Sequence, residues 1–418
     1  MDMVTETALT RAREEALATP LDQINVSDSQ RFADGTHWPF FDRLRAEDPV
    51  HYCDDSDFGP YWSVTKWKDI MEVETNPQVF SSFPVIFIGD PPDEFRLPNF
   101  IAADEPRHSE WRKPVMPGVG GERIAQIEAT IRERVGTILD DLPRNEEFNW
   151  VDRVSIELTT QMLATLFDFP FEDRHLLTYW SDMTTATPQV GAGIMPEEER
   201  RAILFECVEY FFKLWHQRKG KTDRFDFVSL MANTPAMQNF EEEPHKFLGN
   251  LLLLIVGGND TTRNSISGGL KALNDFPDQY YKLRADPSVI PTMVAEIIRW
   301  QTPLSHMRRT ALADYELGGK KIKEGDKVVM WYISANRDTE KFENPYEFDI
   351  TRKNARAHMS FGFGIHRCMG NHVAEMQLRI LWEEIMKRFP RIEVVGEAKR
   401  TKSNFVMGFT DLPVRIPG

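Results

Sequence analysis

Cysteine is scarce in this chain, with only Cys53, Cys207 and Cys368 among 418 residues. No two of them have the C-x-x-C spacing, and three cysteines are too few for a disulfide framework. The composition argues against a small secreted domain held together by disulfides, so we expect the protein in a reducing compartment, the cytoplasm. For any single cysteine, the ordinary interpretation is a small buried hydrophobic side chain.

Long hydrophobic runs and an excess of basic charge are also missing. The longest uniformly apolar run, residues 251–256, is far short of the roughly 20 residues that a membrane-spanning helix requires. The N-terminal residues are polar and do not resemble a signal peptide. A net charge of -15 disfavours broad nucleic-acid binding, which normally needs a basic surface. We therefore expect neither a membrane span nor a nucleic-acid partner.

Helical periodicity dominates the chain. Apolar residues recur at the helical repeat over residues 123–142, 197–218, 247–274, 291–300 and 370–389. Short segments typical of strands cover residues 61–64, 315–317, 327–332 and 391–395. Repeats and low-complexity linkers are lacking, so we expect one mainly helical domain with a small β region over residues 1–418. About the first 35 residues form an N-terminal extension that need not be fully ordered.

The most informative stretch, residues 361–370, reads FGFGIHRCMG. A thiolate that ligates a haem iron must protrude, its charge must be stabilised, and its backbone must approach the macrocycle. Glycines permit that approach, and backbone N–H groups of such a loop can donate to the sulfur. A helix starting at Gly370 would place Cys368 before its positive end, which favours an anionic sulfur, and Phe361 would shield that sulfur from water. The alternative is a glycine-rich turn around a buried cysteine.

A second informative segment reads LLLLIVGGNDTTRNSISGG. Gly257 and Gly258 should each cost a helix about 1 kcal/mol relative to alanine, yet helix-compatible residues lie on both sides. We expect the helix to continue through a distortion there. An acid and a hydroxyl, Asp260 and Thr261, follow one turn later and could deliver the protons that dioxygen cleavage consumes. Tight helix packing, or a helix end, is the alternative interpretation.

Together these two segments resemble the cytochrome P450 family. The pattern F-x-x-G-x-H-x-C-x-G matches the family's haem-binding signature at every fixed position, and the second segment matches its small-Gly-x-acid-Thr motif. The likeness covers nearly the whole chain and is greatest to the soluble bacterial enzymes that hydroxylate terminal carbons of alkanes and fatty acids. It implies the P450 fold and haem b, with Cys368 as axial thiolate ligand, Gly257 against the haem, and Asp260 and Thr261 as a catalytic pair.

The resemblance also implies which cations neutralise the haem propionates. His108 and Arg112 share one helical face, His366 precedes the cysteine by two residues, and Arg309 stands at the expected offset. Neighbouring Arg308 is an alternative to Arg309. For each of these residues a solvated surface charge is the ordinary interpretation.

Glu296 and Arg299 form an E-x-x-R pair on one helix face. An ordinary surface ion pair of this kind contributes under about 1 kcal/mol. By resemblance the two residues are instead the buried structural pair of the P450 fold, joined by the segments ANRD and FENPYEFD.

The substrate must be inferred from apolar segments. We expect the pocket to be lined by Phe87, Leu253, Val256, Leu304, Val406 and Met407, with additional wall from a loop over residues 183–195. Plain core packing is the alternative for each residue. The resemblance implies insertion of one oxygen atom of O2 into an unactivated C–H bond, at the terminal carbon of medium-chain alkanes, fatty acids or related linear chains. Terpenoid or steroid-like substrates are the alternative.

We expect electrons to come from a ferredoxin and its reductase, because the sequence contains no flavin or iron–sulfur domain, and we expect a monomer. Lys113, Arg352, Lys353 and Arg356 could form a basic docking patch, although solvated charges are equally plausible. Other functions fit less well. A peroxide-driven peroxygenase or a non-catalytic haem sensor would not need the acid–alcohol pair, and a zinc protein would need two further ligands at metal spacing.

Overall fold

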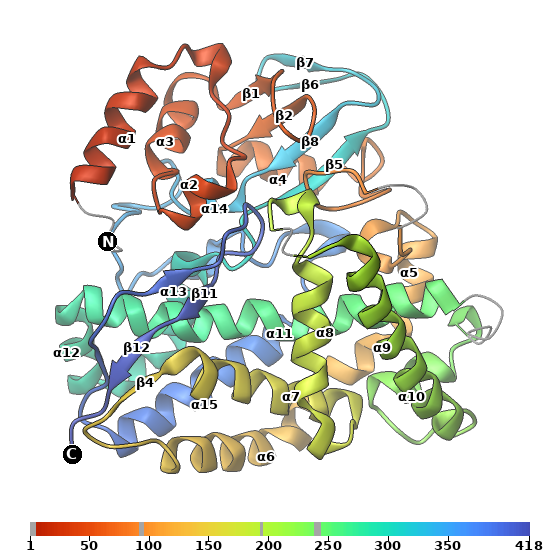
Figure 1. The fold of residues 1–418 in the computed structure, drawn as a ribbon. Coiled ribbons are helices and arrows are strands. Elements are labelled where there is room, and N and C mark those ends of the chain that lie inside the picture. Colours follow the sequence, from red (N-terminus) through yellow and green to blue (C-terminus); the bar gives the residue numbers. More distant parts are fainter. Residues whose placement is uncertain (1–5, 92–95, 193–194, 238–243) are drawn as a thin grey trace.

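The computed structural model describes residues 6–91, 96–192, 195–237 and 244–418. Helices dominate it, with the largest sheet at one end of the molecule and smaller sheets elsewhere (Figure 1). The helices are α1 (Glu6–Ala18), α2 (Ser29–Ala33), α3 (Trp38–Glu47), α4 (Trp67–Glu74), α5 (Arg107–Arg112), α6 (Gly121–Asp140), α7 (Glu157–Phe167), α8 (His175–Thr185), α9 (Glu197–Arg218), α10 (Phe227–Ala232), α11 (Pro244–Asp275), α12 (Pro277–Ala285), α13 (Ile290–Gln301), α14 (Tyr332–Ala335) and α15 (Asn371–Arg388). The expected mainly helical fold is confirmed.

The strands form one five-stranded sheet and three smaller ones. The larger sheet has the order β1-β2-β8-β5-β3, in which β2 and β8 are parallel and the other neighbours antiparallel. The strands are β1 (Val50–Cys53), β2 (Tyr61–Val64), β3 (Phe80–Ser81), β4 (Glu147–Asn149), β5 (Met307–Ala311), β6 (Tyr315–Leu317), β7 (Lys320–Ile322), β8 (Lys327–Met330), β9 (Glu393–Val394), β10 (Lys399–Arg400), β11 (Phe409–Asp411) and β12 (Pro413–Arg415).

Helix α11 crosses the middle of the molecule (Figure 1). It packs against α7, α8, α13 and α15, and buried residues lie on most of its circumference, as expected for a helix inside a large core. Glycine permits the close contact with α13: a methyl group at Gly269 would come within 2.8 Å of Ile297. Among the described residues, no helix is both long and apolar enough to cross a membrane.

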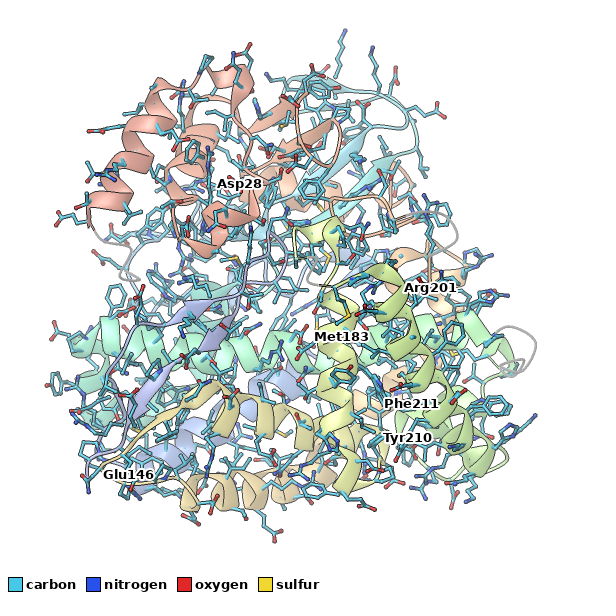
Figure 2. The ribbon with its side chains drawn as sticks, in the orientation of Figure 1. Asp28, Glu146, Met183, Arg201, Tyr210 and Phe211 are labelled. Carbon is cyan, nitrogen blue, oxygen red and sulfur yellow. The ribbon has the colours of Figure 1, made fainter. Side chains whose placement is uncertain are left out.

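Aromatic side chains join helices α7 and α9. Phe211 of α9 is fully buried and lies in edge contact with Phe167, while the hydroxyl of neighbouring Tyr210 donates to Asp173 (Figure 2). Helix α9 coincides with the segment that the sequence predicts over residues 197–218.

The N-terminal residues are folded from Glu6 onward. Helix α1 packs against α3, and its Ala12 and Ala16 are buried in a cluster with Phe41 and Trp331. The described part of the expected extension is thus an ordered layer beside the sheet, while residues 1–5 lie outside the described residues.

One local expectation needs correction. The predicted strand over residues 327–332 ends at Met330, because Trp331 is the N-cap of the short helix α14, which begins at Tyr332. Helix α11 is continuous through Gly257 and Gly258, which confirms the expectation that the helix does not end there. A π-helical turn lies at Val151–Ile156, directly before α7.

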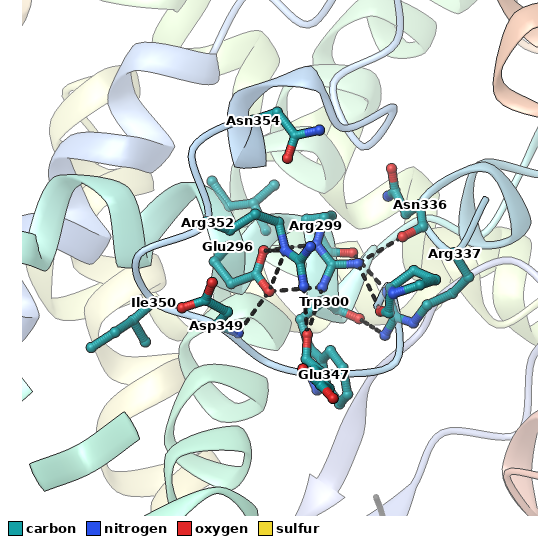
Figure 3. Close-up of polar contacts among 12 residues, drawn as sticks. Glu296, Arg299, Trp300, Asn336, Arg337, Glu347, Asp349, Ile350, Arg352 and Asn354 are labelled. Atoms are coloured by element: carbon teal, nitrogen blue, oxygen red, sulfur yellow. Dashed lines mark hydrogen bonds and ion pairs between the residues drawn. The ribbon is translucent and has the colours of Figure 1, made fainter. Parts of the chain in front are cut away.

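The E-x-x-R pair of α13 is buried. Glu296 and Arg299 have no exposed surface, and Arg299 Nε lies 2.7 Å from Glu296 Oε2. Arg299 also donates to the carbonyl oxygens of Asn336, Pro345 and Glu347 (Figure 3). The pair therefore holds the polypeptide between α14 and the cysteine loop.

Arg352 is the third charged member of this cluster. Its Nε lies 3.1 Å from Glu296 Oε2, and its Nη atoms donate to backbone carbonyls, including that of Glu347 (Figure 3). Only 7% of Arg352 is exposed. The expectation that Arg352 contributes to a surface docking patch is wrong, since its charge is used inside the protein.

Candidate functional site

The cysteine loop is shaped by two glycines with left-handed backbone conformation. Gly362 has φ 61° and Gly364 has φ 64°, values that side chains other than glycine rarely adopt. A methyl group at Gly364 would also come within 2.3 Å of the carbonyl oxygen of Glu74 in α4. The N–H of Cys368 donates to the carbonyl of Phe361 over 2.8 Å, which closes the loop.

Cys368 differs from the other cysteines in its surroundings. It is accessible, whereas Cys53 and Cys207 are buried. Loss of hydration is nevertheless the largest influence on the pKa of Cys368 and raises it, while the backbone N–H of Gly370, the charge of Arg112 and other donors lower it. An accessible cysteine with an N–H donor and cationic groups that stabilise its thiolate suits a cofactor ligand.

The two histidines lie beside one another near this loop. The rings of His108 and His366 are 4.5 Å apart, with His108 Nδ1 3.2 Å from a carboxylate oxygen of Glu105 and His366 Nε2 2.7 Å from the hydroxyl of Ser82. The remaining ring nitrogens, His108 Nε2 and His366 Nδ1, are buried without a hydrogen-bond partner. Because buried polar atoms are normally bonded, this pair fits an anionic group such as the haem propionates.

Arg308 and Arg309 point in different directions, since neighbouring residues of a strand alternate between its faces. Arg308 pairs with Asp90 over 2.5 Å, and Arg309 pairs with Glu74 over 2.8 Å. Burial lowers the pKa of His366 to about 2, and the charge of Arg309 is the next largest cause. Arg309 is therefore the one of the two that lies on the histidine side.

The middle of α11 borders an open space. Gly257 is exposed although it belongs to a buried helix, and a methyl group there would meet no atom within 4 Å. At Gly258 a methyl group would come 2.7 Å from Leu163, so this glycine serves close packing with α7. The hydroxyl of Thr261 donates to the carbonyl of Gly257 over 3.0 Å and thus lies beside the same space.

Asp260 is completely buried next to this threonine. Its Oδ1 accepts from Ser181 and Asn259 and lies 3.1 Å from Arg263 Nη2, while Oδ2 has no partner. The same Arg263 nitrogen lies 2.8 Å from Asp182 on α8, whose side chain is 42% exposed. Burial raises the pKa of Asp182. The charge of Arg263 lowers this pKa, and the charge of Asp260 raises it. Alternating charges therefore lead from Asp260 toward the surface.

Three of the expected pocket residues come together. Phe87, Leu304 and Val406 belong to one apolar cluster, in which Leu304 and Val406 are antiparallel bridge partners. Phe405 belongs to it as well, with its ring 6.3 Å from that of Phe87, and so does Val190.

The other expected pocket residues lie in two different places. Leu253 and Val256 are partly exposed on a helix that is otherwise mostly buried, consistent with the open space beside Gly257. Met407 packs instead into the cluster of the N-terminal helices, so its assignment to the pocket is not supported. In the expected loop over residues 183–195, Met183 is the ninth residue of helix α8 (Figure 2), and residues 193–194 lie outside the described part.

Four residues of the site were missed from the sequence. Arg263 could have been found, because it stands one turn after Asp260 on the same helix. Asp182 and Glu74 reach the site from distant segments, and no local pattern marks them. Phe405 directly precedes the predicted Val406, in an irregular segment where no period indicates which side chain faces the pocket.

Comparison with known proteins agrees with this geometry. Residues 197–415 match the family model for cytochrome P450. The chain is 36% identical over 391 residues to linalool 8-monooxygenase of Pseudomonas putida, covering 90% of this chain and 94% of the relative. It is 30% identical over 389 residues to the methyl-branched lipid omega-hydroxylase of Mycobacterium bovis, covering 90% of each.

A solved structure extends the likeness to three dimensions. Cytochrome P450-153 from Novosphingobium aromaticivorans superposes with a TM-score of 0.88 at 47% identity, covering 94% of this chain and 99% of that one. Sequence and fold thus agree over nearly the whole length. This chain belongs to the cytochrome P450 family, the haem-thiolate monooxygenases.

Proposed function

We propose that this P450 monooxygenase hydroxylates the terminal carbon of medium-chain alkanes, fatty acids or related linear chains. The observation that supports this proposal is an apolar cluster that contains two aromatic rings in contact. Its members include Phe87, Leu304, Phe405 and Val406. Such a wall offers no hydrogen bonds to a polar substrate and suits a slender hydrocarbon chain. A relative named for omega-hydroxylation of a lipid supports the same substrate class.

Haem b fits the residues around Cys368, and when bound it supplies the activation of O2. In this proposal Cys368 holds the iron, and Gly370 in the same loop borders open space, since a methyl group there would meet no atom within 4 Å. Phe361 packs against the edge of the main core. Gly257 borders open space on helix α11, where a methyl group would meet no atom within 4 Å. The propionate partners are His108, Arg112, Arg309 and His366.

Proton delivery is assigned to Asp260 and Thr261. The buried Asp260 retains an unpartnered oxygen that can accept a proton, and the hydroxyl of Thr261 reaches the open space beside Gly257. A positioned group of this kind contributes roughly 10²- to 10⁴-fold to a reaction that consumes protons.

Replacing Thr261 with alanine is expected to leave haem binding intact and to divert electrons from product to hydrogen peroxide. Product formed per NADH consumed should fall by at least about tenfold. This is less than the roughly 10²- to 10⁴-fold contribution of such groups, because water can take over part of the role of the hydroxyl. The measurement is the ratio of product, peroxide and NADH in a reconstituted system. Thr262→Ala removes the same atoms from the buried face of α11 and should stay coupled; equal coupling in both variants would remove the role given to Thr261.

Electrons reach the family's enzymes from a donor protein, and we propose a ferredoxin with its reductase. Exposed basic residues surround the cysteine loop, including Arg367 beside Cys368 and Lys113 after α5. Lys353 is also exposed, and Arg356 is exposed but pairs with Glu375. An acidic donor would be attracted to this face.

Terpenoid substrates are the second candidate, favoured by the relationship to linalool 8-monooxygenase. A screen of spin-state changes decides between the classes, because substrate entry that removes water from the iron shifts the haem absorption. We expect alkanes and fatty acids of medium length to produce the shift, and linalool and steroids to produce a smaller one or none. A shift with linalool or a steroid but with no linear chain would overturn the terminal-hydroxylase assignment.

A further inference from the structure

Glu74, the last residue of α4, is a buried carboxylate that the reaction does not use directly. Only 4% of it is exposed, and one oxygen, Oε2, accepts from Arg309 Nη2 over 2.8 Å. The other oxygen, Oε1, accepts from the hydroxyl of Tyr332, which is itself buried. A carboxylate is costly to bury unless both oxygens are satisfied, and here a cation and a phenol satisfy them.

This carboxylate lies directly against the cysteine loop. A methyl group at Gly362 would come within 3.2 Å of Glu74 Oε1, and one at Gly364 within 2.3 Å of the backbone oxygen of the same residue. Glu74 therefore contacts both the loop that carries Cys368 and the arginine assigned to a propionate.

Arg309 also serves two neighbours. Its ion pair with Glu74 is almost fully buried, with the two side chains 4% and 1% exposed, and its charge is felt at His366. In a poorly hydrated setting a charge acts over longer distances than in water. The share of the Arg309 charge that Glu74 neutralises is thus unavailable to the haem.

Resting on the proposed haem site, we propose that Glu74 is a positioning residue that sets the reduction potential of the haem through Arg309. The ferric state carries one more positive charge than the ferrous state. A nearby negative charge therefore favours the ferric state and lowers the potential. Tyr332 moderates this effect by donating a hydrogen bond to the carboxylate, and burial, followed by the charge of Glu74, raises the pKa of Tyr332 so that it remains a neutral donor.

The two contacts predict shifts of opposite sign. Glu74→Gln keeps the shape but removes the charge, so the potential should rise, with the equilibrium constant for reduction changing by about tenfold, or 59 mV for one electron. Tyr332→Phe removes the donor and strengthens the negative charge of the carboxylate, so the potential should fall by a smaller amount. The matched control is Glu72→Gln on the same helix, where a half-buried glutamate accepts from Tyr315 over 2.7 Å. The haem reduction potential of this control variant should be unchanged.

The experiment is spectroelectrochemical titration of the haem-loaded variants, after each is checked for the ferrous–carbonyl band of thiolate ligation. Loss of this band already in the unsubstituted protein would contradict the proposed function itself. Retention of the band with an unchanged potential in Glu74→Gln, or shifts of the same sign in Glu74→Gln and Tyr332→Phe, would overturn the role of Glu74 alone. If Glu74→Gln fails to retain haem, the downward shift of Tyr332→Phe still tests the inference.

Discussion

Replacing Cys368 with serine is expected to abolish the red-shifted ferrous–carbonyl band and essentially all hydroxylation, while the protein stays folded. A thiolate pushes electron density toward the iron, which favours O–O cleavage. Burial raises the pKa of the Cys368 thiol, and the N–H donor of Gly370 and the charge of Arg112 oppose this rise. The same groups cannot ionise an alcohol near neutral pH. Because Cys368 is accessible, the free energy of unfolding should change by no more than about 0.5 kcal/mol.

The measurement combines carbonyl difference spectra, product analysis and denaturant unfolding. Cys207→Ala provides the reverse control, since Cys207 is fully buried in the main core. It should keep the band and lose about 1 kcal/mol of stability, a typical cost for a core substitution. If the red-shifted band persists in Cys368→Ser, Cys368 is not the ligand.

The features that could be predicted from the sequence are those encoded within one continuous segment. The cysteine loop places its glycines and Cys368 within ten residues, and the turn that they form needs no partner from elsewhere to be recognised. The same is true of Asp260 and Thr261 on α11, and of α9, whose ends coincide with the apolar periodicity. In such cases the local pattern and the tertiary structure demand the same residues.

Residues whose roles arise from tertiary contacts could not be predicted in this way. Arg352 stands beside Lys353 in an apparently polar stretch, and only the folded chain brings it to the buried Glu296. Met407 and Phe405 lie in an irregular segment, where no period indicates which side chain faces the pocket. The physical reason is the same in each case: burial is decided by segments that are distant in sequence.

Replacing Glu296 with glutamine is expected to cause the largest loss of stability in the chain. Glu296 has no exposed surface, and it accepts from Arg299 at 2.7 Å and from Arg352 at 3.1 Å (Figure 3). Burial, together with the charge of Arg299, lowers the pKa of nearby Arg337 to about 9. One carboxylate thus balances several buried guanidinium groups. Removing one partner of a buried pair costs about 3–5 kcal/mol, a large part of the 5–15 kcal/mol that stabilises a typical domain.

The matched control for this prediction is Glu384→Gln. Glu384 accepts from Arg132, Lys387 and Arg388, and although burial opposes it, these hydrogen bonds lower the pKa of Glu384 to about 2. Its cations are hydrated, with 32%, 61% and 24% of their side chains exposed, so water can replace the lost partner and the cost should stay near 1 kcal/mol. Denaturant midpoints and haem content measured on both variants compare the two sites directly. Because both substitutions remove one negative charge from a buried carboxylate among cations, equal losses would show that the charge alone matters. A several-fold larger loss at Glu296 would assign the difference to the burial of its guanidinium partners.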